Sequence, residues 1–107
     1  MKKLLMSFLL LLSFGTLAQT PMFKIENVQI QQTPTGFQEV SATLKNISGQ
    51  KLKPVLVEMV FYKDGMVVGK PLDMLSSSKQ VSANSWNFSV IATTPFDTYE
   101  LGNVRVQ

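Results

Sequence analysis

The sequence predicts an all-β fold in which about seven antiparallel strands form two stacked sheets, a β-sandwich. In several segments after residue 18, apolar and polar residues alternate with period two, as in strands that bury one face. Turn-forming residues separate these segments at intervals of roughly 8–12 residues. No segment of useful length in this part of the chain has a helical period.

The first half of the domain contains three expected strands. Residues 23–31 form the first, in which the apolar phase slips by one residue, as a β-bulge would produce. Proline and glycine within residues 33–36 favour a turn, and residues 37–46 alternate as the second strand. Residues 55–63 form the third strand, which opens at Pro54, where a missing backbone N–H is tolerated.

The second half begins with a hairpin. Asp64 and Gly65 follow the third strand, and an Asp-Gly pair suits a two-residue turn in which both residues need a positive φ. Residues 76–85 are polar and are expected to be mostly loop. Gly102 and Asn103 separate two apolar phases, which indicates a second bulge. The remaining expected strands are residues 66–68, 72–75, 86–90 and 99–106.

The N-terminus has the features of a bacterial signal peptide. Lys2 and Lys3 give a positively charged start, and an apolar run of 11 residues follows from Leu4 to Phe14. A helix that spans a membrane needs about 20 apolar residues, so this run is too short for a stable anchor. Small residues then lead to Ala18, and we expect cleavage between Ala18 and Gln19.

The chain therefore divides into a signal peptide that forms a helix, residues 1–18, and one β-sandwich domain, residues 19–107. We expect the domain to be periplasmic or secreted, with no membrane span after cleavage. It has no cysteine, so neither a disulfide nor a lipid on an N-terminal cysteine can hold it. A domain of about 90 residues can bury about 60–65% of its unfolded surface, which is enough to fold unaided.

The charge distribution argues against a nucleic-acid partner. The whole sequence has 10 basic and 7 acidic residues, a net charge of +3, of which two lysines leave with the signal peptide. The domain then carries a net charge of +1, and Arg105 is its only arginine. Nucleic-acid binding needs clustered basic side chains that displace counterions. The remaining lysines are scattered along the sequence.

The residue types also exclude several kinds of catalytic site. The sequence has no histidine and no cysteine, which removes a histidine base, a thiol nucleophile and the commonest zinc ligands. Only Glu58 interrupts an otherwise apolar strand face, and no second carboxylate is paired with it as a glycosidase requires. We expect Glu58 to face solvent or a cross-strand lysine. The methionines of the domain are dispersed, which favours core packing over copper binding. We predict no catalytic, metal-binding or cofactor-binding residue, no small-molecule ligand and no enzyme activity.

Four segments in a fixed order carry a family resemblance. They are residues 42–49, 60–69, 86–88 and 96–101. Their order and spacing resemble a bacterial FxLYD-type domain, a small immunoglobulin-like or fibronectin-III-like sandwich. The resemblance implies a module of exported bacterial proteins and adds little about mechanism.

The third strand suggests a surface for a partner. Residues 55–63 are apolar on both faces, although a two-layer sandwich buries only one face of each strand. Leu56, Val60 and Tyr62 are therefore our candidate partner surface, because exposed apolar patches often mark an interface. The alternative is that the return strand 66–68, the leader of residues 19–22 or long neighbouring side chains cover this face.

These observations favour a non-enzymatic binding or accessory module of the bacterial envelope. We expect it to act through a sheet face or an edge strand such as residues 66–68. The expected partner is another envelope protein or a second copy of the chain. The alternative is an inhibitor of an exported hydrolase that acts through loops at one end of the sandwich. Pro34 and Phe37 are the candidate loop residues for inhibition, since their segment is similar to a loop of chagasin-like protease inhibitors. The segment is shorter than that loop, and a plain turn is the better interpretation of it.

Overall fold

A computed structural model describes residues 22–107 of the chain. The expected signal peptide, with its cleavage point between Ala18 and Gln19, lies outside the described residues. The described part contains eight strands and one short 3-10 turn, and it has no α-helix. These elements are β1 (Phe23–Gln32), β2 (Gln38–Asn46), β3 (Pro54–Lys63), β4 (Met66–Gly69), β5 (Leu72–Met74), η1 (Ser77–Lys79), β6 (Gln80–Ser82), β7 (Ser85–Ala92) and β8 (Thr98–Val106).

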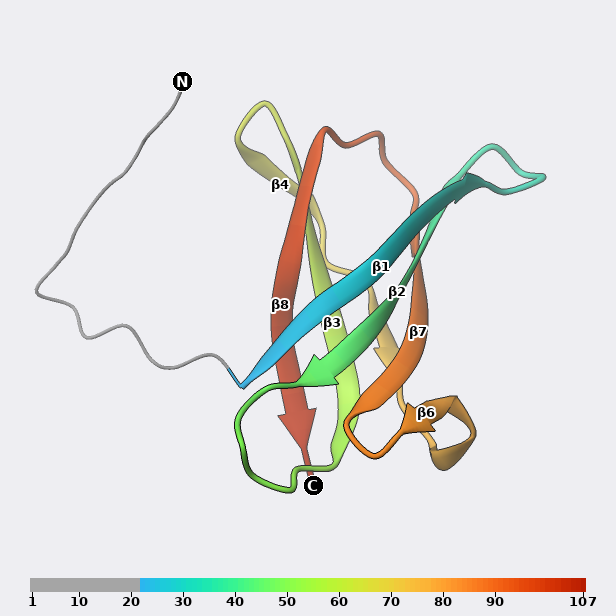
Figure 1. Cartoon of the computed structure of the whole chain (residues 1–107). Coiled ribbons are helices and arrows are strands. Elements are labelled where there is room, and N and C mark those ends of the chain that lie inside the picture. The colour runs from blue at the N-terminus through green and yellow to red at the C-terminus, as the bar shows by residue number, and fades with distance from the viewer. Residues whose placement is uncertain (1–21) are drawn as a thin grey trace, which may run out of the picture.

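The strands form two antiparallel sheets that lie one behind the other (Figure 1). Sheet A has the order β1-β2-β7-β6. In sheet B, β3 is central: β8 pairs along one of its edges, and β4 and β5 pair with separate parts of the other edge. The predicted all-β sandwich is therefore confirmed, with eight strands in place of about seven.

The additional strand is β6, which lies in the segment expected to be mostly loop. All three residues of β6 are exposed, so no alternation of apolar and polar residues marks it in the sequence. It pairs with the beginning of β7, where Gln80 lies opposite Trp86 and Ser82 opposite Ser85. Backbone pairing with a neighbouring strand, rather than burial of side chains, defines this element.

The core lies between the two sheets and is filled by alternate residues of the central strands. In β2 the buried residues alternate with partly exposed ones from Val40 to Asn46. Val57, Met59 and Phe61 are the corresponding residues of β3, and each is at most 1% exposed. The Phe61 ring lies 4.4 Å from Phe96 and 6.4 Å from Tyr99, measured between centroids, so an aromatic cluster closes one end of the core.

Irregular backbone occurs where the sequence predicts it. Asp64 and Gly65 have φ values of 53° and 80°, which confirms the two-residue hairpin between β3 and β4. The pairing of β1 with β2 shifts between Glu26 and Gln29, and Asn27 in this bulge has a φ of 56°. The pairing of β8 with β3 shifts next to Gly102, so the second predicted bulge is also present. Among the described residues, no helix has the length and hydropathy needed to cross a membrane.

Candidate functional site

The predicted partner surface lies on the outer face of β3, away from the core. Because alternate residues of a strand point to opposite sides, Leu56, Val60 and Tyr62 share the face opposite Met59 and Phe61. Leu56 and Tyr62 are partly exposed there. Val60 is only 8% exposed and does not belong to the core cluster, so it contributes little surface.

Neighbouring strands extend this apolar surface. Met74 of β5 lies opposite Leu56, and Val67 of β4 lies opposite Tyr62, so each pair points to the same side of sheet B. Leu72 lies two residues from Met74 on the same side. The exposed fractions are 62% for Met74, 53% for Leu72 and 50% for Val67. We call these five residues the β3 face. Sequence reasoning missed the three from β4 and β5, because alternation within one strand does not give its register against another.

Two polar side chains lie within and beside the β3 face: Glu58 of β3 lies opposite Leu72, and Glu100 of β8 lies opposite Val60. The Tyr62 hydroxyl donates a hydrogen bond to the Glu100 carboxylate, and this bond raises the pKa of Tyr62 because it stabilises the neutral phenol. The Glu58 carboxylate accepts a hydrogen bond from the backbone N–H of Asn103 at 3.3 Å. Glu58 is partly exposed on the solvent side of β3, as expected, and it contacts the bulge of β8 rather than a cross-strand lysine.

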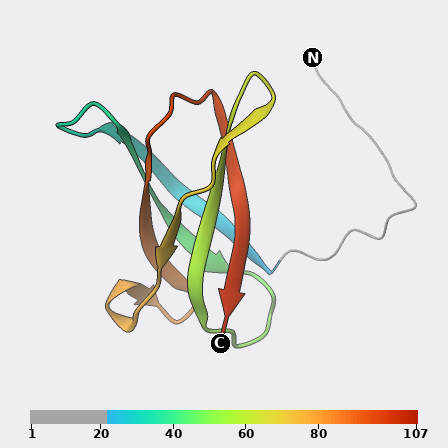
Figure 2. The ribbon, with the colours of Figure 1, turned by 180° about the vertical axis from the view of Figure 1, so that it is seen from behind.

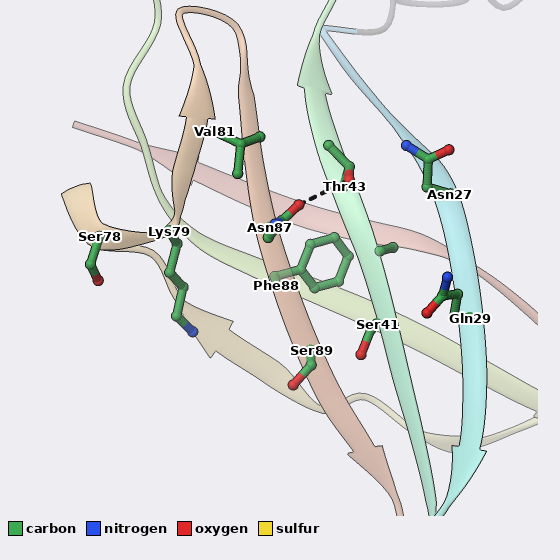
Figure 3. A pocket seen from close by; sticks show the side chains of 11 residues that line it. Asn27, Gln29, Ser41, Thr43, Ser78, Lys79, Val81, Asn87, Phe88 and Ser89 are labelled. Atoms are coloured by element: carbon green, nitrogen blue, oxygen red, sulfur yellow. Dashed lines mark hydrogen bonds between the residues drawn. The ribbon is translucent and has the colours of Figure 1, made fainter.

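The outer face of sheet A has a different chemistry. A shallow hollow of about 560 Å³ lies over β1, β2 and β7, and side chains from η1 and β6 form one side of it (Figure 3). Ser41, Thr43 and Ser89 on β2 and β7 have small side chains, whereas the longer side chains of Asn27, Gln29 and Lys79 lie around them, which makes the surface concave. Thr43 donates a hydrogen bond to the Asn87 side chain at 3.0 Å. Lys79 is the only charged residue of the lining, so the hollow offers hydrogen bonds and no acid–base pair.

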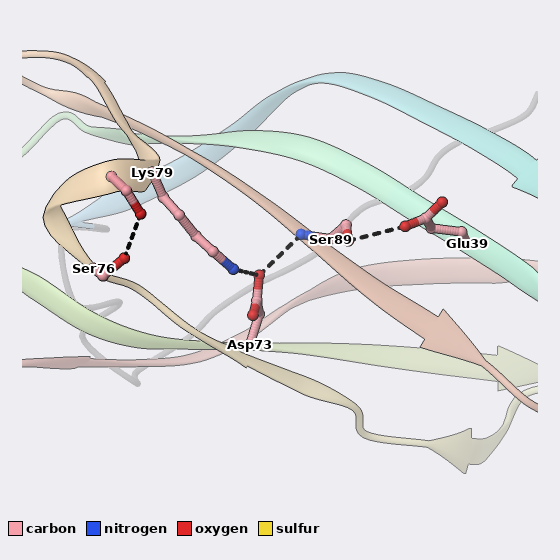
Figure 4. A network of polar contacts seen from close by, with 6 residues as sticks. Glu39, Asp73, Ser76, Lys79 and Ser89 are labelled. Atoms are coloured by element: carbon pink, nitrogen blue, oxygen red, sulfur yellow. Dashed lines mark hydrogen bonds and ion pairs between the residues drawn. The ribbon is translucent and has the colours of Figure 1, made fainter.

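A polar network beside this hollow joins the two sheets (Figure 4). Asp73 of β5 accepts a hydrogen bond from the backbone N–H of Ser89 in β7 at 3.1 Å. The same carboxylate oxygen lies 2.6 Å from Lys79 Nζ. The Ser89 hydroxyl in turn donates to Glu39 of β2 at 3.2 Å. Asp73 therefore accepts the hydrogen bond of a backbone N–H at the edge of sheet A. It also holds the segment between β5 and β6 against that sheet.

Replacement of Asp73 by alanine should lower the free energy of unfolding by about 1 kcal/mol, because a charge-assisted hydrogen bond to a backbone amide is lost. Chemical denaturation followed by Trp86 fluorescence measures this change. Lys79→Met is the matched control: it removes only a partly exposed ion pair and should cost less. An equal loss in both variants would mean that the ion pair, rather than the bond to Ser89, carries the stabilisation.

The candidate loop residues Pro34 and Phe37 lie in the turn between β1 and β2. The Thr33 N–H donates to the Phe37 carbonyl at 2.7 Å, which closes the turn. Phe37 is 43% exposed. A hollow of about 310 Å³ separates it from residues 93–95, so two loops meet at this end of the sandwich.

The described residues contain no cluster of three or more side chains able to ligate a metal ion. Comparison of the chain with known protein families, with curated proteins and with solved structures finds no match. The structure defines the class of the protein as a small antiparallel β-sandwich.

Proposed function

We propose that the chain is a non-enzymatic, exported binding module of a bacterial envelope, and that it binds a protein through the β3 face. The observation that supports this function is the arrangement of apolar side chains on the outer side of sheet B. Leu72, Met74 and Val67 are at least half exposed and lie beside Leu56 and Tyr62. An outward sheet face in a sandwich is ordinarily polar, and exposed apolar patches often mark interfaces.

The surroundings of the β3 face fit a protein partner. Protein interfaces combine an apolar centre with a polar rim. Here Glu100 lies opposite Val60, and Arg105 lies opposite Leu56, both on β8. The resemblance to FxLYD-type domains and the signal-peptide features support the proposed export, which places the partner in the envelope.

The test compares crosslinking of the mature protein in its own envelope before and after charges are placed on the β3 face. A Leu72→Lys, Met74→Lys double variant should lose the species in which the chain is crosslinked to a different protein, because two buried ammonium groups oppose apolar contact. Val81→Lys is the matched control, since Val81 is a 57% exposed strand residue of sheet A. Capture of a different protein that persists in the double variant, or that is absent from the unmodified protein, would contradict the proposal.

The alternative function, inhibition of an exported hydrolase, depends on another part of the molecule. It is favoured by the exposed Phe37 ring and the hollow between it and residues 93–95. Pro34→Ala and Phe37→Ala would abolish inhibition and leave capture by the β3 face unchanged. The same two variants therefore serve as a further control in the crosslinking experiment.

A further inference from the structure

Most sheet edges of the described chain carry features that hinder pairing with another strand. β4, β5 and β6 are three or four residues long. The free edge of β8 is interrupted by its bulge and carries Glu100. On β7, the N–H of Ser89 is already bonded to Asp73. Short strands, bulges and charges are the usual means by which proteins protect sheet edges.

The second half of β1 lacks this protection. Residues 29–32 read Gln-Ile-Gln-Gln, with no charge, proline or glycine. All four are exposed, and the exposed fraction of Ile30 is 44%. Figures 1 and 2 show from opposite sides that this end of β1 and the turn to β2 project beyond the other strands. A further strand could therefore approach this edge.

The direction of the free hydrogen-bonding groups follows from the turn. The Thr33 N–H bonds to Phe37, so Thr33 and Phe37 form a hydrogen-bonded pair. Such pairs alternate with non-hydrogen-bonded pairs along an antiparallel ladder. Gln32 lies opposite Gln38 and Ile30 opposite Val40, so both are in non-hydrogen-bonded positions. The backbone N–H and C=O groups of Ile30 and Gln32 consequently point away from β2.

We propose that this edge pairs with the same edge of a second copy, in antiparallel orientation about a twofold axis at Gln31. Ile30 of each copy then lies opposite Gln32 of the other, and each such pair forms two backbone hydrogen bonds. The two Gln31 side chains meet across the axis, and the two Ile30 side chains approach diagonally on the other side. Sheet A becomes continuous through both copies.

A second copy fits this edge because the segment is self-complementary. A twofold axis places the same patch on both partners, and residues 29–32 bring no like charges together. The contact is short, so the dimer is weak and depends on protein concentration. It uses neither β4 nor β5, so it is independent of the proposed function and leaves the β3 face open.

A single cysteine tests this geometry directly, because the chain has no cysteine of its own. In the proposed dimer the Cα atoms of the two residues at position 31 lie about 4.5 Å apart, as in other non-hydrogen-bonded pairs, within the range that a disulfide spans. Gln31→Cys should therefore form a disulfide-linked dimer under mild oxidation. Gln29→Cys is the matched control on the same strand and face, with its two copies about 14 Å apart along the strands.

The expected result is rapid, nearly complete crosslinking of Gln31→Cys and only slow crosslinking of Gln29→Cys. Addition of Gln32→Pro to Gln31→Cys should abolish the disulfide, because it removes an outward N–H while β1 keeps its bonds to β2. Thermal unfolding checks that the proline variant remains folded. A Gln31→Cys protein that stays monomeric, or equal crosslinking at positions 29 and 31, would overturn the proposal whether or not the β3 face captures a partner.

Discussion

Replacement of Phe61 by alanine should lower the free energy of unfolding by about 3–5 kcal/mol. Phe61 is 1% exposed and lies on β3, the strand that pairs with β4, β5 and β8. Its ring contacts Phe96, and its cluster with Tyr99 links β3, β8 and the segment that precedes β8. Alanine would remove the buried ring and leave a cavity between the sheets. Urea denaturation followed by Trp86 fluorescence measures the change, since Trp86 is buried in sheet A.

Two further variants show whether the stabilisation by Phe61 comes mainly from burial of its apolar volume or from its contact with the Phe96 ring. Phe61→Leu keeps most of the apolar volume and should cost much less than alanine. Phe96→Ala removes the partner ring from a partly exposed position and should also cost less. The free energy of unfolding of a small domain is about 5–15 kcal/mol, so the loss predicted for Phe61→Ala is a large fraction of it. A loss below about 1 kcal/mol would show that the core at this end closes without the Phe61 ring.

Local sequence features predict the parts of the fold that depend on neighbouring residues. The alternation from Val40 to Asn46 marks β2 because that strand buries one face throughout. Asp64 and Gly65 mark the β3–β4 hairpin because both adopt a positive φ. The phase slip in β1 corresponds to the bulge between Glu26 and Gln29. Each of these features is set within a few residues, so one sequence suffices to find it.

The candidate binding surfaces depend on contacts between distant residues, which one sequence does not give. Alternation placed Leu56 and Tyr62 on the outer side of β3, but Met74 joins them only through the register of β5. Asp73 reaches the N–H of Ser89 across 16 residues and between two sheets. No local pattern marks either contact, because strand register and edge capping are decided when the sheets assemble.

The burial of Val60 also depends on a contact between strands, in this case with β8 at Gly102. The alternation of side chains places Val60 on the solvent-facing side of β3, yet Val60 is only 8% exposed. β8 approaches it closely at the bulge: a Cβ atom at Gly102 would lie 3.0 Å from Val60 Cγ2. The same Cβ would lie 2.7 Å from Glu58 Oε1 and 3.1 Å from the Glu58 carbonyl oxygen. Glycine is needed at this position because it leaves room between β8 and β3.

Gly102→Ala should therefore lower the free energy of unfolding by about 1–3 kcal/mol, the usual cost of forcing an extra methyl group into a packed site. The Glu58 carboxylate can rotate away, but the Glu58 carbonyl oxygen belongs to the backbone of β3 and cannot. A Glu58→Ala, Gly102→Ala double variant should consequently recover only part of the loss, and denaturation of the four proteins of this cycle measures the coupling.

Gly69→Ala is the matched control for the change from glycine to alanine. A Cβ at Gly69 would meet its nearest neighbour, Pro71 Cδ, at 3.9 Å, which is ordinary contact. Without a steric penalty, alanine mainly reduces the freedom of the unfolded chain, so Gly69→Ala should be neutral or stabilise by up to about 1 kcal/mol. Equal stability of the two alanine variants would mean that β8 moves away from β3 at little cost, and the close approach at Gly102 would then not be what holds the bulge against Glu58.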